Sequence, residues 1–190
     1  QNFARAFDVT FQNKNNQEEL VYATSWGVST RLVGAVIMAH GDDKGLRLPP
    51  KIAPHQVVMV PIAKNENGHL KVREFISPVL DEMRKGGIRI YEDWSDNSPG
   101  FKFNEWEMKG VPLRLEVGPR DIESGQAVLV RRDTGQKIIL EKNMITEQAP
   151  RLLEEIQKGL FEQALIFREK NTHEVSSYSN FGDTVKNKGG

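Results

Sequence analysis

The sequence contains no cysteine. Disulfide bonds and thiolate metal sites are therefore excluded, and we expect a reducing, cytoplasmic environment. The few histidines are scattered along the chain without metal-ligand spacing, so we expect no metal held by this chain alone. They are His40, His55, His69 and His173.

Long apolar runs are missing as well. None approaches the roughly 20 residues that a membrane-spanning helix needs, and the first residues do not have the pattern of a signal peptide. We therefore expect no membrane partner. An excess of either charge is also missing, because 26 Lys and Arg balance 26 Asp and Glu. This balance gives no global electrostatic reason to bind nucleic acid.

Alternating apolar residues predict a β-hairpin near the N-terminus. "FDVTF" places Phe7, Val9 and Phe11 on one face, "NKNNQ" is rich in turn residues, and "LVYATSW" has the composition of a returning strand. A helix with one apolar face is expected over residues 32–40, ending at Gly41. The prolines of "GDDKGLRLPPKIAP" predict a loop, which we interpret as a domain boundary.

Strands then alternate with helices, which predicts an α/β domain with a mixed sheet. The apolar run "QVVMVPI" is typical of a strand buried on both faces. A helix follows over residues 72–83, in which Pro78 either kinks the helix or restarts it with Ser77 as N-cap. We expect further strands at "IRIYED", "VPLRLEVG", "QAVLVRRD" and "QKIILE", a short helix at "PGFKFNEWEMKG" and a long helix from about Pro150.

Arg31 is expected in the first turn of the helix that follows "TSWGVST". A cation at this end of a helix is unfavourable by roughly 0.3–1 kcal/mol unless it is compensated. A bound phosphate would compensate it, because Gly27 permits close approach and Ser29 and Thr30 offer hydroxyls. Trp26 would add a flat apolar wall. The alternative is an arginine that points to solvent or pairs with a carboxylate.

The same stretch resembles motif 3 of the class II aminoacyl-tRNA synthetases, a strand and helix that end in an arginine. "NFARAFDVTF…SWGVSTRLVGA…HGDDKGLRLPPKIAPHQVV" resembles the prolyl-tRNA synthetases of the archaeal and eukaryotic type. "PGFKFNEWEMKGVPLRLEVGPRD" and "VRRDTG" continue the resemblance, which covers essentially the whole chain. The fold class that it implies is α/β: a class II anticodon-binding domain, with a mixed sheet flanked by helices, preceded by the last hairpin and helix of the antiparallel catalytic domain.

The resemblance implies three segments. Residues 1–52 would end the catalytic domain, residues 53–150 would form the anticodon-binding domain, and residues 151–190 would lead by a helix into a C-terminal domain. Motifs 1 and 2 of the family would precede Gln1. We therefore expect a fragment of a longer enzyme that is a homodimer at full length, and we expect this chain alone not to activate proline.

The activity implied is that of a proline–tRNA ligase, which activates proline with ATP and Mg²⁺ and transfers it to tRNA(Pro). By the resemblance, Arg31 is a catalytic residue that contacts ATP. Ser29 and Thr30 would lie beside it at the ATP site, and Trp26 and Gly27 would line the pocket shared by proline and the adenylate.

Four residues match the family's anticodon-reading positions: Glu107, Arg114, Arg120 and Asp121. Proline anticodons end in two guanines, which arginine and carboxylate side chains read well. We expect these residues to share one rim of the sheet, with Lys102, Lys109, Arg131 and Arg132 near phosphates.

Plainer interpretations of these residues remain open. Glu107 could pair with Lys109 or Arg114, Arg114 and Glu116 could be solvated strand residues, and Phe101, Phe103 and Trp106 are expected in the core. An alternative function is a non-catalytic tRNA- or RNA-binding module derived from a synthetase anticodon domain.

Overall fold

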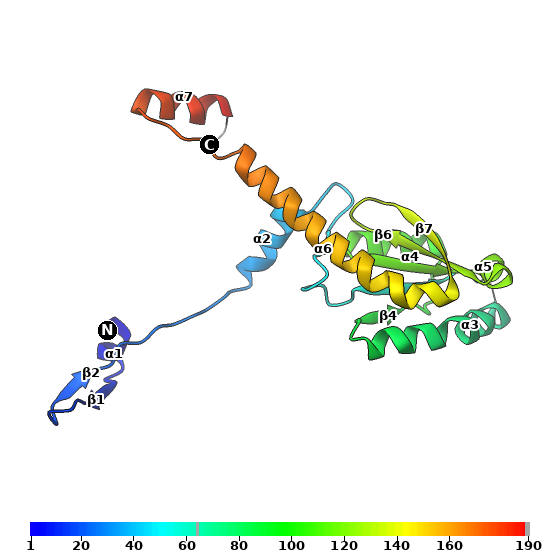
Figure 1. Ribbon diagram of the computed structural model, residues 1–190, viewed down its shortest axis with the longest axis horizontal. Coiled ribbons are helices and arrows are strands. Elements are labelled where there is room, and N and C mark those ends of the chain that lie inside the picture. The colour runs from blue at the N-terminus through cyan, green and yellow to red at the C-terminus, as the bar shows by residue number, and fades with distance from the viewer. Residues whose placement is uncertain (64, 189–190) are drawn as a thin grey trace. The chain divides into compact units, whose positions relative to one another are not determined.

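The computed structural model describes residues 1–63 and 65–188, which divide into two compact units, Gln1–Gly34 and Ala35–Gly190 (Figure 1). The division falls within the helix α2 (Arg31–His40). The proline-containing loop that we interpreted as a domain boundary belongs to the second unit. The predicted boundary after residue 52 stays a prediction. No helix of the described residues is long and apolar enough to cross a membrane.

The first unit contains a short helix and a small hairpin. The helix α1 (Asn2–Ala6) was not expected, and the strands β1 (Thr10–Gln12) and β2 (Glu18–Leu20) pair antiparallel. The hairpin prediction is confirmed, but the returning strand was expected to continue to residue 26 and instead ends at Leu20. Phe7 is 74% exposed and Phe11 is 46% exposed. The apolar face of the hairpin is therefore not buried, and it does not stabilise longer strands.

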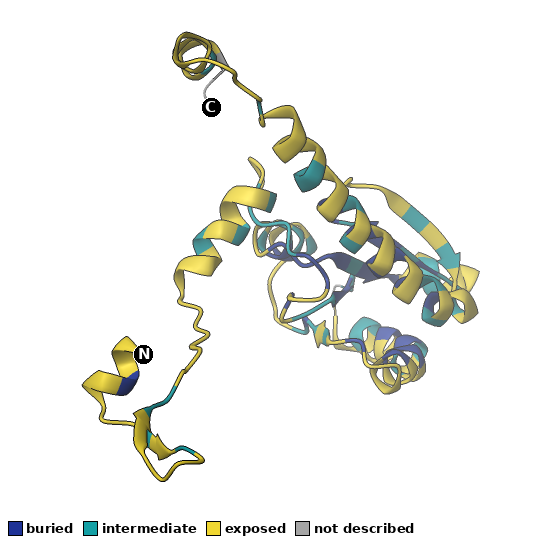
Figure 2. Cartoon of the chain, turned by 60° about the vertical axis from the view of Figure 1, so that its left-hand side comes forward, coloured by how far each residue is buried: buried dark blue, intermediate teal, exposed yellow. Residues whose placement is uncertain are grey.

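The helix α2 confirms the expectation for residues 32–40. Its ten residues, all of them described, include none that is buried, which Figure 2 shows as a mostly yellow helix. Its apolar side chains, Leu32 and Val33 among them, are therefore left exposed to solvent.

The second unit is built on a five-stranded mixed sheet of order β4-β3-β5-β6-β7. The bounds are β3 (Val57–Pro61), β4 (Ile90–Glu92), β5 (Leu113–Val117), β6 (Gln126–Arg131) and β7 (Lys137–Glu141). The strand β3 is parallel to β4 and β5, whereas β6 is antiparallel to both of its neighbours. The predicted mixed sheet and the hairpin of β6 and β7 are confirmed.

Helices cover β3 from both sides, as its continuous apolar run predicted. Val57 and Met59 pack with residues of α3 (Glu66–Lys85) and α6 (Ile145–Lys170) in the main core. Val58 and Val60 pack on the other face with Trp106 and Phe103 of α4 (Pro99–Met108). All five residues of β3 are buried, and Figure 2 shows the buried strands in dark blue. The three-layer arrangement follows from this strand.

The structure decides between the two interpretations of Pro78. The helix α3 continues through it, and Ser77 is not a cap, because its hydroxyl donates to the carbonyl of Arg73 at 2.7 Å. The actual N-cap is Asn65, whose side chain accepts from the backbone N–H of Gly68 at 2.8 Å. Burial of the apolar stripe of α3, which includes Val72 and Ile76, outweighs the hydrogen bond lost because proline has no backbone N–H.

Other bounds differ from the sequence predictions. The helix α6 begins at Ile145, before Pro150, and continues through that proline. Its apolar stripe is buried as far as Leu160, but Phe167 is 71% exposed. A short helix α5 (Pro119–Ser124), a 3-10 turn η1 (Lys142–Met144) and a helix α7 (Tyr178–Lys188) were not expected.

Two glycines allow the loop of residues 41–48 to lie against the end of α4. Leu46 N–H donates to the Met108 carbonyl at 2.9 Å, and Leu48 N–H donates to the Gly110 carbonyl at 3.1 Å. A Cβ on Gly110 would stand 2.5 Å from the carbonyl carbon of Leu46, and one on Gly45 would stand 2.6 Å from the Met108 oxygen. Both glycines also have positive φ, at 73° and 124°, so side chains are excluded on two grounds.

Gly110→Ala is therefore expected to destabilise the second unit by about 1–3 kcal/mol or more, because it combines positive φ with a backbone clash. Gly100→Ala is the matched control in the same helix region, since a Cβ there meets nothing within 4 Å. Urea denaturation followed by circular dichroism measures both. Equal stabilities of the two variants would contradict this view of the contact.

Candidate nucleic-acid interface

The residues predicted to bind ATP lie in the first unit, at the start of α2. Arg31 is the first residue of that helix, and its backbone N–H donates to the hydroxyl of Ser29 at 3.3 Å. The carbonyls of Ser29 and Thr30 accept from Leu32 and Val33 at 3.1 and 3.0 Å. Arg31 thus lies at the positive end of the helix dipole, as its sequence position predicted.

Trp26 and Gly27 precede this helix in an irregular segment. Trp26 is 94% exposed, and a Cβ on Gly27 would meet nothing within 4 Å. Both residues are open to a ligand. Their roles at a proline and adenylate pocket, and those of Ser29, Thr30 and Arg31 at ATP, stay predictions.

In the second unit, Glu107 and Arg114 line one cavity of about 180 Å³. Glu107 comes from the last turn of α4, and Arg114 comes from the second position of β5. Trp106 and Val111 form apolar walls. Four further cationic residues line the same cavity: Lys44, Arg131, Arg132 and Lys137.

Arg114 is not a freely solvated strand residue. Its side chain is 15% exposed and its Nε donates to Glu116 Oε1 at 2.8 Å. The guanidinium also lies over the ring of Phe103, 4.3 Å from the ring centroid. Glu116 is itself buried. The arginine is therefore held in one orientation on the α4 side of the sheet, which leaves less freedom to lose on binding.

Glu107 pairs with neither of the partners considered from the sequence. Its carboxylate lies 3.2 Å from Lys44 Nζ, whereas Lys109 pairs with Glu105 at 2.6 Å. The Glu107 side chain is 33% exposed and that of Lys44 is 67% exposed. A contact this exposed contributes little stability, so an incoming ligand can replace Lys44 at the carboxylate.

Arg120 and Asp121 line a second cavity of about 670 Å³, at the end of β5. Arg120 is exposed, and Asp121 Oδ2 accepts from the Gly118 backbone N–H at 2.7 Å, which caps α5. The two cavities have no lining residue in common. The expectation of one shared rim is therefore corrected: Arg114 and Gly118 are four positions apart, or about 13 Å along an extended strand.

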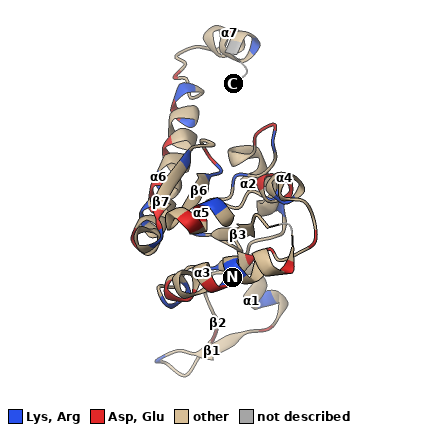
Figure 3. Ribbon diagram, turned by 90° about the vertical axis from the view of Figure 1, so that its right-hand side faces the viewer, with Lys and Arg blue, Asp and Glu red and all other residues tan. Residues whose placement is uncertain are grey.

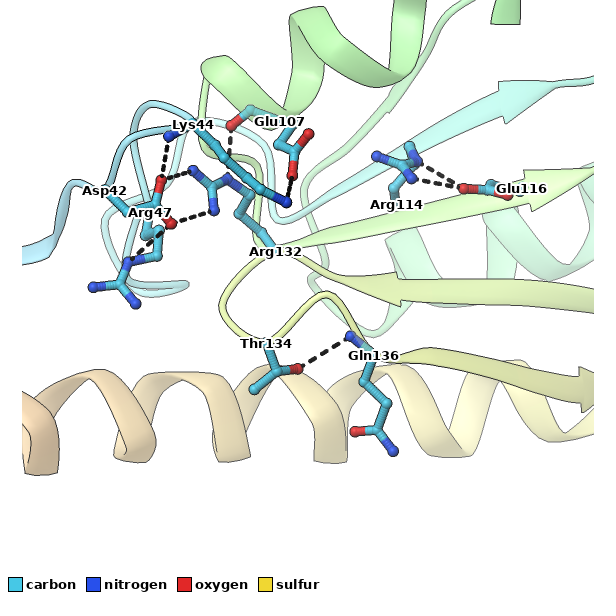
Figure 4. A network of polar contacts seen from close by, with 9 residues as sticks. All are labelled: Asp42, Lys44, Arg47, Glu107, Arg114, Glu116, Arg132, Thr134 and Gln136. Carbon is cyan, nitrogen blue, oxygen red and sulfur yellow. Dashed lines mark hydrogen bonds and ion pairs between the residues drawn. The ribbon is translucent and has the colours of Figure 1, made fainter. Parts of the chain in front are cut away.

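A polar network joins the loop of residues 41–48 to this site (Figure 4). Asp42 accepts from Arg132 Nη1 and Nη2 at 2.9 and 2.6 Å, and Arg132 Nε donates to the Glu107 carbonyl at 2.7 Å. The hydrogen bonds from Arg132 lower the pKa of Asp42 from 3.8 to about 2. Arg132 is only 9% exposed, so the expectation that it contacts phosphates is wrong.

The helix α4 is also anchored by buried polar groups. Lys102 is 2% exposed, and its Nζ donates to the Asp93 carbonyl at 2.9 Å. Asp93 Oδ2 accepts from Trp106 Nε1 at 2.7 Å. Burial raises the pKa of Asp93, but hydrogen bonds from Ser95 and Trp106 outweigh burial and leave it below its usual value. The predicted phosphate contact of Lys102 is therefore wrong, because the amine is buried.

The remaining expectations have mixed outcomes. Trp106 is buried, as predicted, whereas Phe101 is 56% exposed and lies outside the core. Arg131 donates to Asp133 and Glu155, and the Asp133 contact is the main cause of its raised pKa. Lys109 is exposed and lies over the Trp106 ring, 4.4 Å from its centroid. Of the four cations expected near phosphates, Lys109 is the one that the geometry leaves most accessible.

Asp42 and Lys44 were interpreted from the sequence only as loop residues. Their stretch "GDDKG" belongs to the wording that resembles the synthetases, but that wording does not indicate a contact between Asp42 and Arg132. The two are 90 positions apart. Among residues 1–63 and 65–188, no group of three or more His, Cys, Asp or Glu side chains is placed to hold a metal ion.

Comparison with known proteins extends these observations. The family "Anticodon binding domain" matches residues 56–156. A proline–tRNA ligase of Prosthecochloris aestuarii is 53% identical over 189 residues, which is 98% of this chain and 39% of that protein. One of Symbiobacterium thermophilum is 49% identical over 173 residues, covering 91% of this chain and 35% of the relative.

Solved structures show the same similarity. The prolyl-tRNA synthetase of Cryptosporidium parvum in complex with halofuginone and AMPPNP matches 99% of this chain with a TM-score of 0.86 and 38% sequence identity. A second structure of that enzyme, with L-proline and AMP, has a TM-score of 0.83. This chain covers 38% and 40% of those two chains, so it spans well under half the length of the relatives it matches. The chain belongs to the anticodon-binding domain family of class II synthetases, and its homologues are proline–tRNA ligases.

Proposed function

We propose that this chain is part of a proline–tRNA ligase, in which its second unit reads the anticodon of tRNA(Pro) and the segment before α2 contacts ATP. The full-length enzyme would join proline to ATP, release pyrophosphate and transfer proline to the terminal ribose of the tRNA. The similarity to proline–tRNA ligases over 98% of the chain supports this proposal. The Cryptosporidium enzyme with L-proline and AMP supports proline and the adenylate as ligands.

The proposal includes several properties of the full-length protein. It would be a cytoplasmic homodimer, with residues 1–52 ending the catalytic domain, 53–150 forming the anticodon-binding domain and 151–190 leading into a C-terminal domain. Mg²⁺ would arrive with the ATP phosphates, since they supply oxygen ligands of the kind that it prefers.

The pairing of charges in the two cavities carries the anticodon proposal. Each cavity contains one of the predicted arginines and one carboxylate: Arg114 and Glu107 in the first, and Arg120 and Asp121 in the second. A guanine presents acceptors at O6 and N7 and donors at N1 and N2, which match an arginine and a carboxylate respectively. Two such pairs in separate cavities suit two guanines whose bases are splayed apart from a single-stranded loop.

The charge distribution supports recognition by few contacts. Figure 3 shows Lys and Arg positions interspersed with Asp and Glu positions along the ribbon of the second unit, and the whole chain has a formal net charge of zero. Backbone attraction alone is therefore expected to be modest. Selectivity would come from base edges, with Lys109 available for a phosphate.

The residues before α2 resemble the synthetases, and so does the second unit. This resemblance of both parts favours the proposed function over a non-catalytic RNA-binding module. A module that only binds RNA has no need of the arginine that begins α2. The stretch that resembles motif 3 includes Ser29 and Arg31.

Glu107→Gln is expected to weaken binding of a tRNA(Pro) transcript by roughly ten- to a hundredfold, because the amide presents a donor to the guanine N1 and N2 donors. The variant should bind a transcript without the anticodon guanines about as weakly as the unmodified chain does. Fluorescence anisotropy with labelled transcripts measures both affinities.

The matched control is Glu105→Gln, on the same helix. Glu105 pairs with Lys109 and does not line the first cavity, so this variant should keep the preference for guanine. If Glu107→Gln weakened both transcripts equally, Glu107 would have no part in base recognition.

Arg31→Ala in the full-length enzyme is expected to lower proline-dependent ATP–pyrophosphate exchange by roughly a hundredfold, because it removes a positioned charge at the reacting phosphates. Affinity for tRNA should stay unchanged. Lys14→Ala, in the hairpin turn of the same unit, serves as the control and should exchange normally. Normal exchange by Arg31→Ala would overturn the ATP assignment.

A further inference from the structure

Four residues form a closed ring of side-chain and backbone contacts beside the first cavity (Figure 4). Arg132 binds the Asp42 carboxylate through two nitrogens and the Glu107 carbonyl through a third. Asp42 Oδ1 also accepts from the backbone N–H of Lys44 at 3.0 Å. Lys44 Nζ then reaches the Glu107 carboxylate at 3.2 Å, which closes the ring.

We propose that Asp42 and Arg132 are positioning residues for base recognition. They set the positions of Glu107 and of Lys44, the lysine that Glu107 must release when a base binds. This proposal rests on the proposed anticodon function. The pair holds both sides of one contact: Arg132 holds the backbone of Glu107, and Asp42 holds the backbone of Lys44. Neither Asp42 nor Arg132 presents a charge that needs to touch the base.

The geometry explains why an arginine is required at position 132. A bidentate contact to one carboxylate and a third hydrogen bond from Nε use the planar fork of guanidinium donors. The Arg132 side chain is 5% exposed, and that of Asp42 is 33% exposed. A lysine has no such fork, so it cannot hold the loop and the end of α4 at the same time.

The contact between loop and helix is specified by more than this ion pair. Gly45 and Gly110 permit the close approach of backbones, and two backbone hydrogen bonds join the segments. The buried groups around Lys102 and Asp93 hold the rest of α4, including Trp106, the residue before Glu107. Loss of Asp42 would therefore leave α4 attached and would change mainly the positions of Lys44 and of the Glu107 side chain.

The test is tRNA binding by this chain with one anticodon guanine replaced at a time. For the unmodified chain, each replacement gives a discrimination ratio. Asp42→Asn should lower the ratio roughly tenfold at the guanine that Glu107 reads and should leave the ratio at the other guanine unchanged. Arg132→Lys should do the same, because it keeps the charge and loses the fork.

Two controls separate this effect from others. Asp43→Asn changes the neighbouring exposed carboxylate and should leave both ratios unchanged. Thermal melting checks that each variant is folded at the temperature of the titration. Glu107→Gln identifies the guanine that Glu107 reads.

The outcomes distinguish the two proposals. If Glu107→Gln lowers one ratio but Asp42→Asn and Arg132→Lys lower neither, the positioning role is wrong and the anticodon function stands. If the two variants lower both ratios equally, their effect is general destabilisation, and the positioning role is again wrong. If Glu107→Gln itself leaves both ratios unchanged, the anticodon assignment of this cavity fails first.

Discussion

The strand β3 has to be covered on both of its faces, because all five of its residues are apolar and buried. On one face the cover comes from α3 and α6, and on the other it comes from Trp106 and Phe103 of α4. This second cover is what places the last turn of α4 beside β5. Glu107 on that turn and Arg114 on that strand then line the same cavity. The requirement to bury one strand thus brings a carboxylate and an arginine together.

Most charged groups of the candidate site are already held by other charged groups. Arg114 is oriented by Glu116, Arg132 by Asp42, and Asp121 caps the start of α5. Such contacts restrict these side chains before a ligand arrives, so less conformational freedom is lost on binding. The chain has no net charge. Selectivity for an RNA therefore agrees better with a few well-placed side chains than with a basic surface.

Much of the fold could be predicted from the sequence, because its strongest patterns are local. The continuous apolar run of β3 reflects burial on both faces, and the structure confirms it. In β5, Leu113, Leu115 and Val117 are buried as their pattern predicts, but so is Glu116. The short helices α1 and α5 have no such pattern. Lys102 was misjudged because its burial depends on the Asp93 carbonyl, and Arg132 because its partner lies 90 residues away. Periodicity carries no information about such contacts, so the ring around Glu107 could not be predicted from it.

The central claim is that the second unit recognises anticodon bases and not only the RNA backbone. Titration of this chain with a tRNA(Pro) transcript, and with the same transcript lacking both anticodon guanines, at two salt concentrations, tests this most directly. Backbone contacts weaken as salt rises, whereas the ratio between the two RNAs reports base contacts. The account predicts a preference for the intact anticodon that persists at the higher salt. Equal affinities that fall together with salt would contradict it.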